Sequence, residues 1–429
     1  MILRVIDHPY EFDMKNLCIT FFPHEKIRLE GEEDPVVVTT RRETDGSFFV
    51  SAKVYDVYRE TTAKPEPADE EHLVLSVTLY RLLSGILGFA PPWGVLYGVR
   101  PAKLMHRLCA QMGDDAAVAH FQTAFLTQKS KAELAHEVML HENRSIARSG
   151  PKSFSLYVSI PFCPTRCAYC SFVSHSIEKT HKLMTPYVDL LLRELEETAK
   201  YAKELGLELA TVYFGGGTPT TLSAQDLGRI FSTIEQNFDL SHLMEYTVEA
   251  GRPDTVTRER LEVIRAAGVQ RISINPQSFN DKVLEAIGRR HTAQQTLDAF
   301  ALARDCGFDH INMDFIAGLP EDDLPSFQRS IQTALDLQAE SITVHTLALK
   351  TSAYMVTREQ TFDLKDRLTV SNMVDYAGQT LHGAGYYPYY MYRQSKSLGN
   401  LENVGWCKLG YDCLYNVYMM DETHTVLAV

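Results

Sequence analysis

The sequence predicts an α/β protein whose central part is a parallel β-sheet. After residue 150, six apolar strand candidates alternate with helical segments, at spacings of about 30 to 50 residues. Strands that alternate with helices in this way are joined by crossover connections, which make neighbouring strands parallel. Such a sheet either closes towards a barrel or stays open and doubly wound, and the pattern alone leaves both architectures open.

Residues 1–150 are predicted to form a separate α+β domain. Its expected strands are Leu3–Ile6, Leu17–Phe22, Val36–Thr40 and Ser47–Tyr55. A linker at Lys64–Asp69 leads into a long helix in which apolar residues recur at helical spacing, and three further helical stretches continue to about Arg148. Since this domain contains no recognisable catalytic motif, its role stays open.

The second domain is predicted to span residues 151–350, after the punctuation Ser149-Gly150-Pro151. Its expected strands are Phe154–Ile160, Ala210–Phe214, Glu245–Ala250, Arg271–Asn275, His310–Phe315 and Ser341–Leu347. The expected helices are 184–206, 222–237, 254–267, 279–305 and 322–338. From about Thr351 the alternation stops, so residues 351–429 form a third domain with a helix at 366–383 and a strand at Tyr386–Tyr392.

Composition excludes several classes of partner. The net charge of −13 is spread as single acids and short clusters, which argues against nucleic acid and anionic membranes because both require basic patches. No segment approaches about 18 consecutive apolar residues, and the N-terminus lacks the apolar run of a signal peptide. We therefore expect a cytoplasmic protein with reduced cysteines. Five scattered cysteines are expected to be buried free thiols: Cys18, Cys109, Cys306, Cys407 and Cys413.

The most informative motif is the triplet Cys163, Cys167 and Cys170, which follows the first strand of the second domain. Three thiolates at such short spacing indicate a metal site. A CxxC redox pair needs only two cysteines, and a structural zinc ion needs four ligands, for which His175 is the nearby candidate. Three thiolates on one loop suit an iron–sulfur cluster that keeps one iron open for a ligand. We favour the cluster.

A glycine run, Gly215–Gly217, precedes Thr218-Pro219-Thr220 after the second predicted strand. Glycines let the backbone approach a ligand closely, although a tight strand-to-helix turn explains the run equally well. No lysine follows as in a phosphate-binding P-loop, so a nucleoside triphosphate is not expected. Beside the cysteine loop, this segment is suited to holding the amino and carboxylate groups of a ligand bound to the open iron.

Polar side chains lie at or near the ends of the four following strands: Glu249, Gln277, Asp314 and His345. A single acid of this kind is often a helix cap, but four on consecutive strands would all face the mouth of the sheet. Arg289 or Arg290 is suited to binding a carboxylate, and the other is expected at the surface. Packing or rim positions are expected for His291 and for the tyrosines Tyr386, Tyr387, Tyr389, Tyr390 and Tyr392.

Together these motifs resemble the radical S-adenosylmethionine (SAM) enzymes, and in particular the oxygen-independent coproporphyrinogen III oxidase family. The resemblance rests on IPFCPTRCAYC, GGGTPT, the segment Gln277–Asn280 and DFIAGLP, and it covers residues 154 to about 350. The N-terminal segment PWGVLYGVRPAKL at 92–104 resembles the coproporphyrinogen dehydrogenase branch called HemZ.

The resemblance implies a partial (β/α)6 barrel in which the cysteine triplet binds a [4Fe-4S] cluster and SAM chelates the fourth iron. By the same resemblance, SAM is held by Tyr157, Tyr169, Gly216, Gly217, Thr218 and Glu249, and a second SAM is contacted by Gln277, Arg289 and Asp314. Catalytic roles fall to Tyr157, Gln277, Arg289 and Asp314. The implied reaction splits SAM to a 5′-deoxyadenosyl radical, which takes hydrogen from a propionate of coproporphyrinogen III so that CO2 leaves and a vinyl group forms. The implied electron donor is a protein such as flavodoxin or ferredoxin.

The sequence departs from the family pattern in two places. Phe172 stands where the established oxidases carry another cysteine, and the chain stops at Val429 within an expected strand, so the C-terminal α+β domain is expected to be incomplete. A rival function is that of the family's heme chaperones, which carry His-Asn-x-x-Tyr-Trp. The comparable segment here, Gly399–Val404, lacks the His and the Tyr-Trp pair. A radical SAM enzyme for another tetrapyrrole is a third possibility.

Overall fold

The computed structural model describes residues 1–429 except 24, 99, 349, 351–352, 354–363 and 395. The chain divides into two compact units. The first unit consists of Met1–Glu137, Thr361–Leu368 and Arg393–Glu402, and the second of Val138–Gln360, Thr369–Tyr392 and Asn403–Val429. The division into three sequential domains at residues 150 and 350 stays a prediction.

The first unit is built on a four-stranded sheet in the order β1-β2-β3-β4. Strands β1 (Ile2–Ile6) and β2 (Val36–Arg42) are parallel, whereas β3 (Phe48–Val54) and β4 (Val57–Ala63) continue antiparallel. Its helices are α1 (Glu11–Phe21), α2 (Glu71–Leu87), α3 (Pro101–Met112), α4 (Asp114–Thr123) and the beginning of α5 (Lys129–Ile146). Helices α1 and α2 pack their apolar residues against the sheet and form its core.

One predicted strand in this unit is wrong. Residues Leu17–Phe22 belong mostly to helix α1, because Met14, Leu17, Cys18 and Phe21 recur at the helical spacing of three and four residues and are all essentially inaccessible. The apolar run Leu17–Phe22 is short enough to be mistaken for a buried strand when the preceding turn is ignored. Strand β4 was not predicted, since nearly all of it is exposed to solvent.

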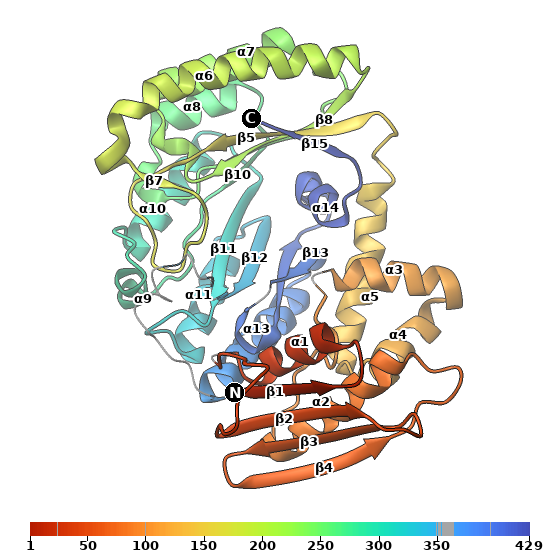
Figure 1. Cartoon of the computed structure of the whole chain (residues 1–429). Coiled ribbons are helices and arrows are strands. Elements are labelled where there is room, and N and C mark those ends of the chain that lie inside the picture. Colours follow the sequence, from red (N-terminus) through yellow and green to blue (C-terminus); the bar gives the residue numbers. More distant parts are fainter. Residues whose placement is uncertain (24, 99, 349, 351–352, 354–363, 395) are drawn as a thin grey trace. The chain divides into compact units, whose positions relative to one another are not determined.

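The second unit contains the predicted parallel sheet. Strands β5 (Ser153–Ile160), β8 (Glu208–Gly216), β9 (Glu245–Glu249), β10 (Arg271–Ser273), β11 (Ile311–Ala317) and β12 (Ser341–Thr346) lie side by side in chain order. Every pairing among these six strands is parallel. The six strands predicted from the alternating pattern are therefore confirmed, and their carboxyl ends lie at one end of the sheet (Figure 1).

Helices connect these strands. They are α6 (Ile177–Glu204), α7 (Ala224–Asn237), α8 (Arg258–Ala266), α9 (Asp281–Ala286), α10 (Ala293–Asp305) and α11 (Leu324–Asp336). The single helix predicted at 279–305 is wrong, because two helices occupy this range. Gly288 with a φ of +74° follows the end of α9, and a capping box formed by Thr292 and Gln295 begins α10. The break between the two helices contains Arg289.

Further elements extend the sheet at both edges. Strand β14 (Glu402–Cys407) pairs antiparallel with β12, and β13 (Tyr387–Arg393) lies beyond it. Strand β15 (Thr425–Ala428), the strand expected at the end of the chain, pairs parallel with β5. The predicted helix at 366–383 is α13 (Leu364–Gly383), and Thr351 lies outside the described residues. Figure 1 shows α14 (Leu414–Asp421) on the face of the sheet opposite to α6 and α7.

Helix α14 lies against the inner face of the sheet because two contacts hold it there. The carboxylate of Glu245 on β9 accepts hydrogen bonds from the backbone N–H groups of Leu414 (2.6 Å) and Tyr415 (3.3 Å) at the start of the helix. The ring of Tyr415 stacks on Tyr213 of β8, with centroids 4.4 Å apart. The inner face of the sheet is thus lined by polar and aromatic side chains.

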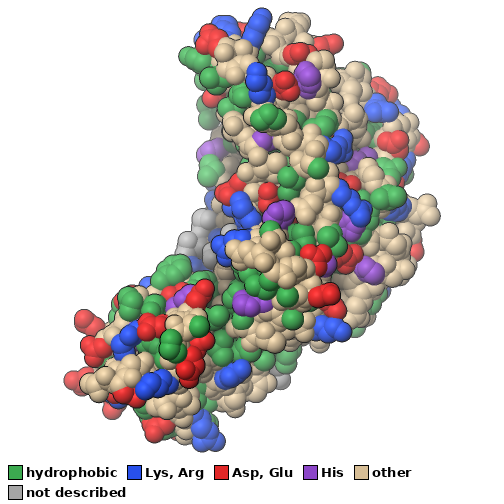
Figure 2. Space-filling view, turned by 90° about the vertical axis from the view of Figure 1, so that its right-hand side faces the viewer, with side chains coloured by type: hydrophobic (Ala, Val, Ile, Leu, Met, Phe, Trp, Pro, Cys, Tyr) green, Lys and Arg blue, Asp and Glu red, His purple; other side chains and the backbone are tan. Residues whose placement is uncertain are grey.

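The surface and the cysteines complete the comparison with the sequence. On the face in Figure 2, acidic and basic side chains are interspersed without a large patch of one sign. Among the described residues, no helix is both long and apolar enough to cross a membrane.

Cys18, Cys407 and Cys413 are buried thiols as expected, but that expectation is wrong for Cys109 and Cys306, which are partly exposed.

Candidate active site

The cysteine triplet lies on the loop that follows β5. Cys163 ends the two-residue strand β6 (Phe162–Cys163), which pairs with β7 (His175–Ser176), so both ends of the loop are held together. The middle of the loop is tied to the break between α9 and α10, where Ala168 N–H donates to the carbonyl of Ile287 at 2.9 Å. The loop thus has a defined shape before any metal binds.

The donor set of the loop bears on the choice between the candidate metals. A structural zinc ion takes four ligands, whereas this loop offers the three free cysteines Cys163, Cys167 and Cys170. Three thiols suit an iron–sulfur cluster, in which each cysteine binds a different iron and one iron stays open.

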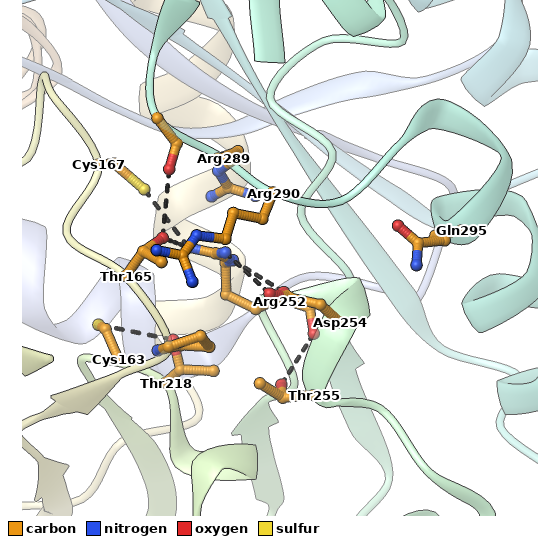
Figure 3. Close-up of polar contacts among 12 residues, drawn as sticks. Cys163, Thr165, Cys167, Thr218, Arg252, Asp254, Thr255, Arg289, Arg290 and Gln295 are labelled. Atoms are coloured by element: carbon orange, nitrogen blue, oxygen red, sulfur yellow. Dashed lines mark hydrogen bonds and ion pairs between the residues drawn. The ribbon is translucent and has the colours of Figure 1, made fainter. Parts of the chain in front are cut away.

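The glycine loop packs directly against the cysteine loop. Gly217 N–H donates to Ile160 O at 2.7 Å, and Thr218 N–H donates to Phe162 O at 2.7 Å. The Thr218 hydroxyl lies 3.6 Å from the Cys163 sulfur, as Figure 3 shows. A side chain at position 217 would place its Cβ 2.6 Å from Phe162 O and 3.0 Å from the Cys163 sulfur. Glycine is therefore required for this close approach of the two loops.

Cys167 is the most buried of the three cysteines and faces a guanidinium group. Arg252 Nη1 lies 3.7 Å from the Cys167 sulfur and 3.2 Å from the Thr165 hydroxyl (Figure 3). The same guanidinium binds both carboxylate oxygens of Asp254, at 3.0 and 2.9 Å. Sequence reasoning missed Arg252, which lies in the loop after β9, because an arginine that follows a strand carries no signal of its own in a sequence.

Arg289 approaches the same loop from the break between α9 and α10. Its side chain is buried and donates to Asn275 O at 2.6 Å and to the Tyr169 hydroxyl at 3.3 Å. Burial alone would lower the pKa of Arg289, but Tyr169 and Cys167 beside it raise this pKa above its usual value. Arg290, by contrast, is exposed and forms an ion pair with Glu178 at 2.7 Å. It is therefore the one of the two arginines that lies at the surface.

Glu249 and Tyr157 belong to an aromatic cluster on the inner face of the sheet. The Tyr213 hydroxyl donates to Glu249 Oε1 at 2.6 Å, and Tyr157 stacks on both Tyr213 and Tyr415. Burial raises the pKa of the Glu249 carboxyl to about 7, although the hydrogen bond from Tyr213 opposes the shift. This carboxyl group is therefore ready to ionise when a cation binds beside it.

Gln277, in the loop that follows β10, has a left-handed backbone conformation. Its φ is +67°, and its backbone pairs with β11 through Gln277 N–H to Asp314 O (2.9 Å) and Ile316 N–H to Gln277 O (3.2 Å). A glutamine in the left-handed region is strained, and such strain is concentrated at functional sites. The pairing holds the buried Gln277 side chain beside β11.

Asp314 lies within β11 rather than at its end. Asn312 Nδ2 donates to Asp314 Oδ1 at 2.8 Å, and His345 Nε2 lies 3.9 Å from Asp314 Oδ2. Burial alone would raise the pKa of Asp314, but His345 and Asn312 lower it below its usual value. Asp314 is thus an ionised carboxylate held in place by two neighbouring strands.

Several buried polar atoms at this end of the sheet have no hydrogen-bond partner among the described residues. They include Asn275 Oδ1, Gln277 Oε1 and Arg289 Nε. Buried polar atoms are nearly always paired in native proteins, so a group of orphans indicates the position of a polar ligand. The acceptors Asn275 Oδ1 and Gln277 Oε1 and the donor Arg289 Nε together suit the amino, carboxylate and ribose groups of SAM. Asn275 was predicted only as a strand residue, because its unsatisfied oxygen is not visible in a sequence.

The structure therefore gathers the predicted residues into three neighbouring groups around the strand ends. Cys163 lies with Gly216, Gly217 and Thr218; Cys167 and Tyr169 lie with Arg289; Tyr157 lies with Glu249 through Tyr213. Gln277, in the loop after β10, forms an isolated bridge to β11, the strand that contains Asp314. The assignment of these residues to SAM binding or catalysis stays a prediction, which their clustering supports.

Comparisons with known proteins agree with this description. Residues 157–334 match the model of the radical SAM superfamily. An oxygen-independent coproporphyrinogen-III oxidase-like protein, HemZ, of Bacillus subtilis is 34% identical over 97% of this chain and 86% of its own length. The heme chaperone HemW of the same organism is 38% identical over 46% of this chain, and the match spans 51% of that protein.

A solved structure shares the fold. Coproporphyrinogen III oxidase from Escherichia coli, a radical SAM enzyme, superimposes with a TM-score of 0.50. The superposition covers 68% of this chain and 66% of that chain at 22% sequence identity. The partial barrel expected from the sequence is thereby confirmed for the second unit.

Proposed function

Since the chain belongs to the radical SAM family of oxygen-independent coproporphyrinogen III oxidase-like proteins, we propose that it oxidatively decarboxylates coproporphyrinogen III. In this proposal it is a cytoplasmic enzyme of heme synthesis that converts propionate side chains to vinyl groups. The observation that carries the proposal is the alignment with the HemZ protein over 97% of the chain, including the first unit, at 34% identity. Matches with heme chaperones are shorter: they cover 46% of this chain for the Bacillus subtilis protein and 61% for that of Escherichia coli.

Radical SAM proteins use a [4Fe-4S] cluster and SAM, and the residues present fit both. The chemistry that this pair supplies is one-electron cleavage of SAM to methionine and a 5′-deoxyadenosyl radical. We assign the three cysteines to the cluster because they are free thiols on one loop whose two ends are paired through β6 and β7. The Glu249 carboxylate is suited to the SAM ammonium group, and Gln277 and Arg289 offer a free acceptor and a free donor beside it.

The protein's part in the reaction is positioning and protection. We assign the orientation of the substrate to Asp314 and His345; they lie on the adjacent strands β11 and β12 and contact each other at 3.9 Å, which supports this assignment. Hydrogen abstraction from a propionate leaves a carbon radical; loss of CO2 and of one electron to a one-electron acceptor then gives the vinyl group. Each propionate thus loses CO2 and two hydrogen equivalents. Exclusion of water by the surrounding aromatic side chains protects the radical.

One specific observation disfavours heme binding of the chaperone type. At the position comparable to the chaperones' histidine stands Gly399, whose φ is +63°, so that a side-chain ligand at this position would be strained. Asn403, at the position of the tyrosine, is buried and binds backbone groups, accepting from Thr346 N–H at 2.9 Å and donating to Tyr392 O at 3.2 Å. These positions serve the fold, which supports the enzyme.

The test is an anaerobic assay with reconstituted protein, reductant, SAM and coproporphyrinogen III, with products identified by mass spectrometry. We expect 5′-deoxyadenosine together with products that have lost CO2 plus two hydrogens in steps. Deoxyadenosine without any change in the porphyrinogen would reject the substrate but keep the radical SAM chemistry. Tight binding of added heme, without deoxyadenosine, would favour the chaperone.

Two variants assign the site. Cys167→Ala is expected to remove the cluster, measured as iron and sulfide content, and with it all deoxyadenosine formation. Asp314→Asn is expected to keep the cluster and to lower product formation by at least about tenfold, because a charged positioning group is lost. The exposed Arg290→Gln serves as the matched control and should behave as the parent protein. An Asp314→Asn variant with parental turnover would remove Asp314 from the site.

A further inference from the structure

Arg252 has a single well-defined arrangement beside the cysteine loop. Its side chain is 4% exposed. Two of its nitrogens form a bidentate pair with Asp254 (3.0 and 2.9 Å), which aims the remaining Nη1 at Cys167 and Thr165 (Figure 3). The guanidinium therefore cannot turn away from the sulfur without breaking the pair with Asp254. A bidentate pair of this kind gives orientation as well as attraction.

The three cysteines differ in their polar surroundings. Cys167 lies 3.7 Å from the Arg252 guanidinium, whereas the contact of Cys163 is the neutral hydroxyl of Thr218 at 3.6 Å. Arg289 also lies beside Cys167 and donates to the Tyr169 hydroxyl at 3.3 Å. Arg252 and Arg166 act electrostatically on Cys163 and Cys170 as well, but Cys167 is the ligand that Arg252 contacts directly.

We infer that Arg252 is a positioning residue that sets the reduction potential of the iron–sulfur cluster through Cys167. Reduction from [4Fe-4S]2+ to [4Fe-4S]+ adds one electron from a one-electron donor, and no bond forms or breaks in the protein. A positive charge near a ligand sulfur stabilises the more negative, reduced cluster, and hydrogen bonds to the sulfur act in the same direction. Arg252 therefore makes the cluster easier to reduce.

Asp254 provides a second variant, in which the reduction potential should shift in the direction opposite to that of Arg252→Gln. Its carboxylate cancels part of the Arg252 charge, so removing either partner breaks the same ion pair but changes the net charge in opposite directions. Arg252→Gln lowers the potential because it removes the cation. Asp254→Asn raises the potential because it leaves the cation uncompensated. A purely structural role of the pair would move both variants in the same direction.

The experiment is a redox titration of each reconstituted variant, with the reduced cluster quantified by electron paramagnetic resonance. We expect Arg252→Gln to lower the ratio of reduced to oxidised cluster at a fixed potential by about tenfold, which equals about 59 mV for one electron. Asp254→Asn should raise that ratio severalfold. The control is Arg290→Gln, in which the same charge is removed from an exposed side chain 67% accessible to solvent; it should leave the ratio unchanged because solvent screens it.

Each outcome decides the inference. Shifts of opposite sign for Arg252→Gln and Asp254→Asn support it; equal potentials in all variants, or shifts of one sign, overturn it. If Arg252→Gln fails to assemble a cluster, Arg252→Lys takes its place, because lysine keeps the positive charge without the bidentate fork. The potential of Arg252→Lys should equal that of the parent protein or lie between those of the parent and Asp254→Asn. A fall in this potential as large as that expected for Arg252→Gln would overturn the inference. The titration needs no porphyrinogen, so it is independent of the proposed substrate.

Discussion

Replacing Gly217 with alanine tests whether the glycine loop exists to approach the cysteine loop. The Cβ of an alanine at this position would lie 2.6 Å from Phe162 O, 2.8 Å from Ile160 O and 3.0 Å from the Cys163 sulfur. Two of these three atoms belong to the backbone, so neither can move aside as a flexible side chain would. The loops must therefore separate, and Cys163 moves with them.

The magnitude follows from the packing. Extra methyl groups in well-packed positions cost about 1–3 kcal/mol, and two backbone contacts below 3.0 Å place Gly217→Ala at the upper end, about 3 kcal/mol. A matched control is Gly228→Ala on α7, where the nearest atom would be Val263 Cγ1 at an ordinary 3.7 Å. Because alanine favours a helix interior over glycine, this control should gain about 0.5–1 kcal/mol.

The assay has two readouts. Urea denaturation followed by circular dichroism gives the free energy of unfolding, and iron and sulfide analysis gives the cluster content after reconstitution. Gly217→Ala is expected to lose most of its cluster as well as stability, whereas Gly228→Ala keeps a full cluster. Parental cluster content in Gly217→Ala, or equal losses in both variants, would refute the packing argument and leave the glycine run as an ordinary turn.

Two further predictions concern buried charges. Lys131→Met should cost about 3 kcal/mol, measured by thermal denaturation. The variant removes the buried cation that contacts the Glu402 carboxylate at 2.6 Å, although the hydrogen bond from Trp93 Nε1 at 2.7 Å remains. The double variant Lys131→Met with Glu402→Leu should recover most of the loss. Burial raises the pKa of Glu249 to about 7. The free energy of unfolding of the ligand-free protein should therefore fall as the pH rises from the carboxyl pKa of the unfolded chain through about 7. Over the same pH range SAM should bind more tightly, because its ammonium group favours the ionised carboxylate. Calorimetric titrations of Glu249→Gln, in which both trends should vanish, check this.

Much of the fold could be predicted because local patterns and tertiary packing agree. The strands of the second unit are apolar runs separated by helical segments, and the structure contains all six in chain order. Prediction was wrong where a short apolar run suits either element, as in Leu17–Phe22, and where a helical pattern conceals a break, as between α9 and α10. In the second case the break turns Arg289 inward, where it donates to Asn275 O.

The candidate site could be predicted only in part, since its residues come from several strands. The cysteines and glycines are adjacent in sequence and carry their own signal. Arg252 carries none, because an arginine after a strand is ordinary until the fold brings it within 3.7 Å of Cys167, 85 residues earlier in the chain. The same holds for Asn275, whose oxygen is notable only because it is buried without a partner among the described residues.

The missing information is therefore electrostatic rather than topological. Sequence motifs identify which thiols bind a cluster, but the properties of that cluster depend on charges delivered from separate loops. Arg252 arrives after β9 and Arg289 after α9, and both converge on Cys167, while Asp254 offsets one of them. Two proteins with identical cysteine and glycine motifs would differ in how readily their clusters accept an electron if these arginines differed. Reduction is the step that precedes every radical reaction, so these residues set the conditions under which the site is active.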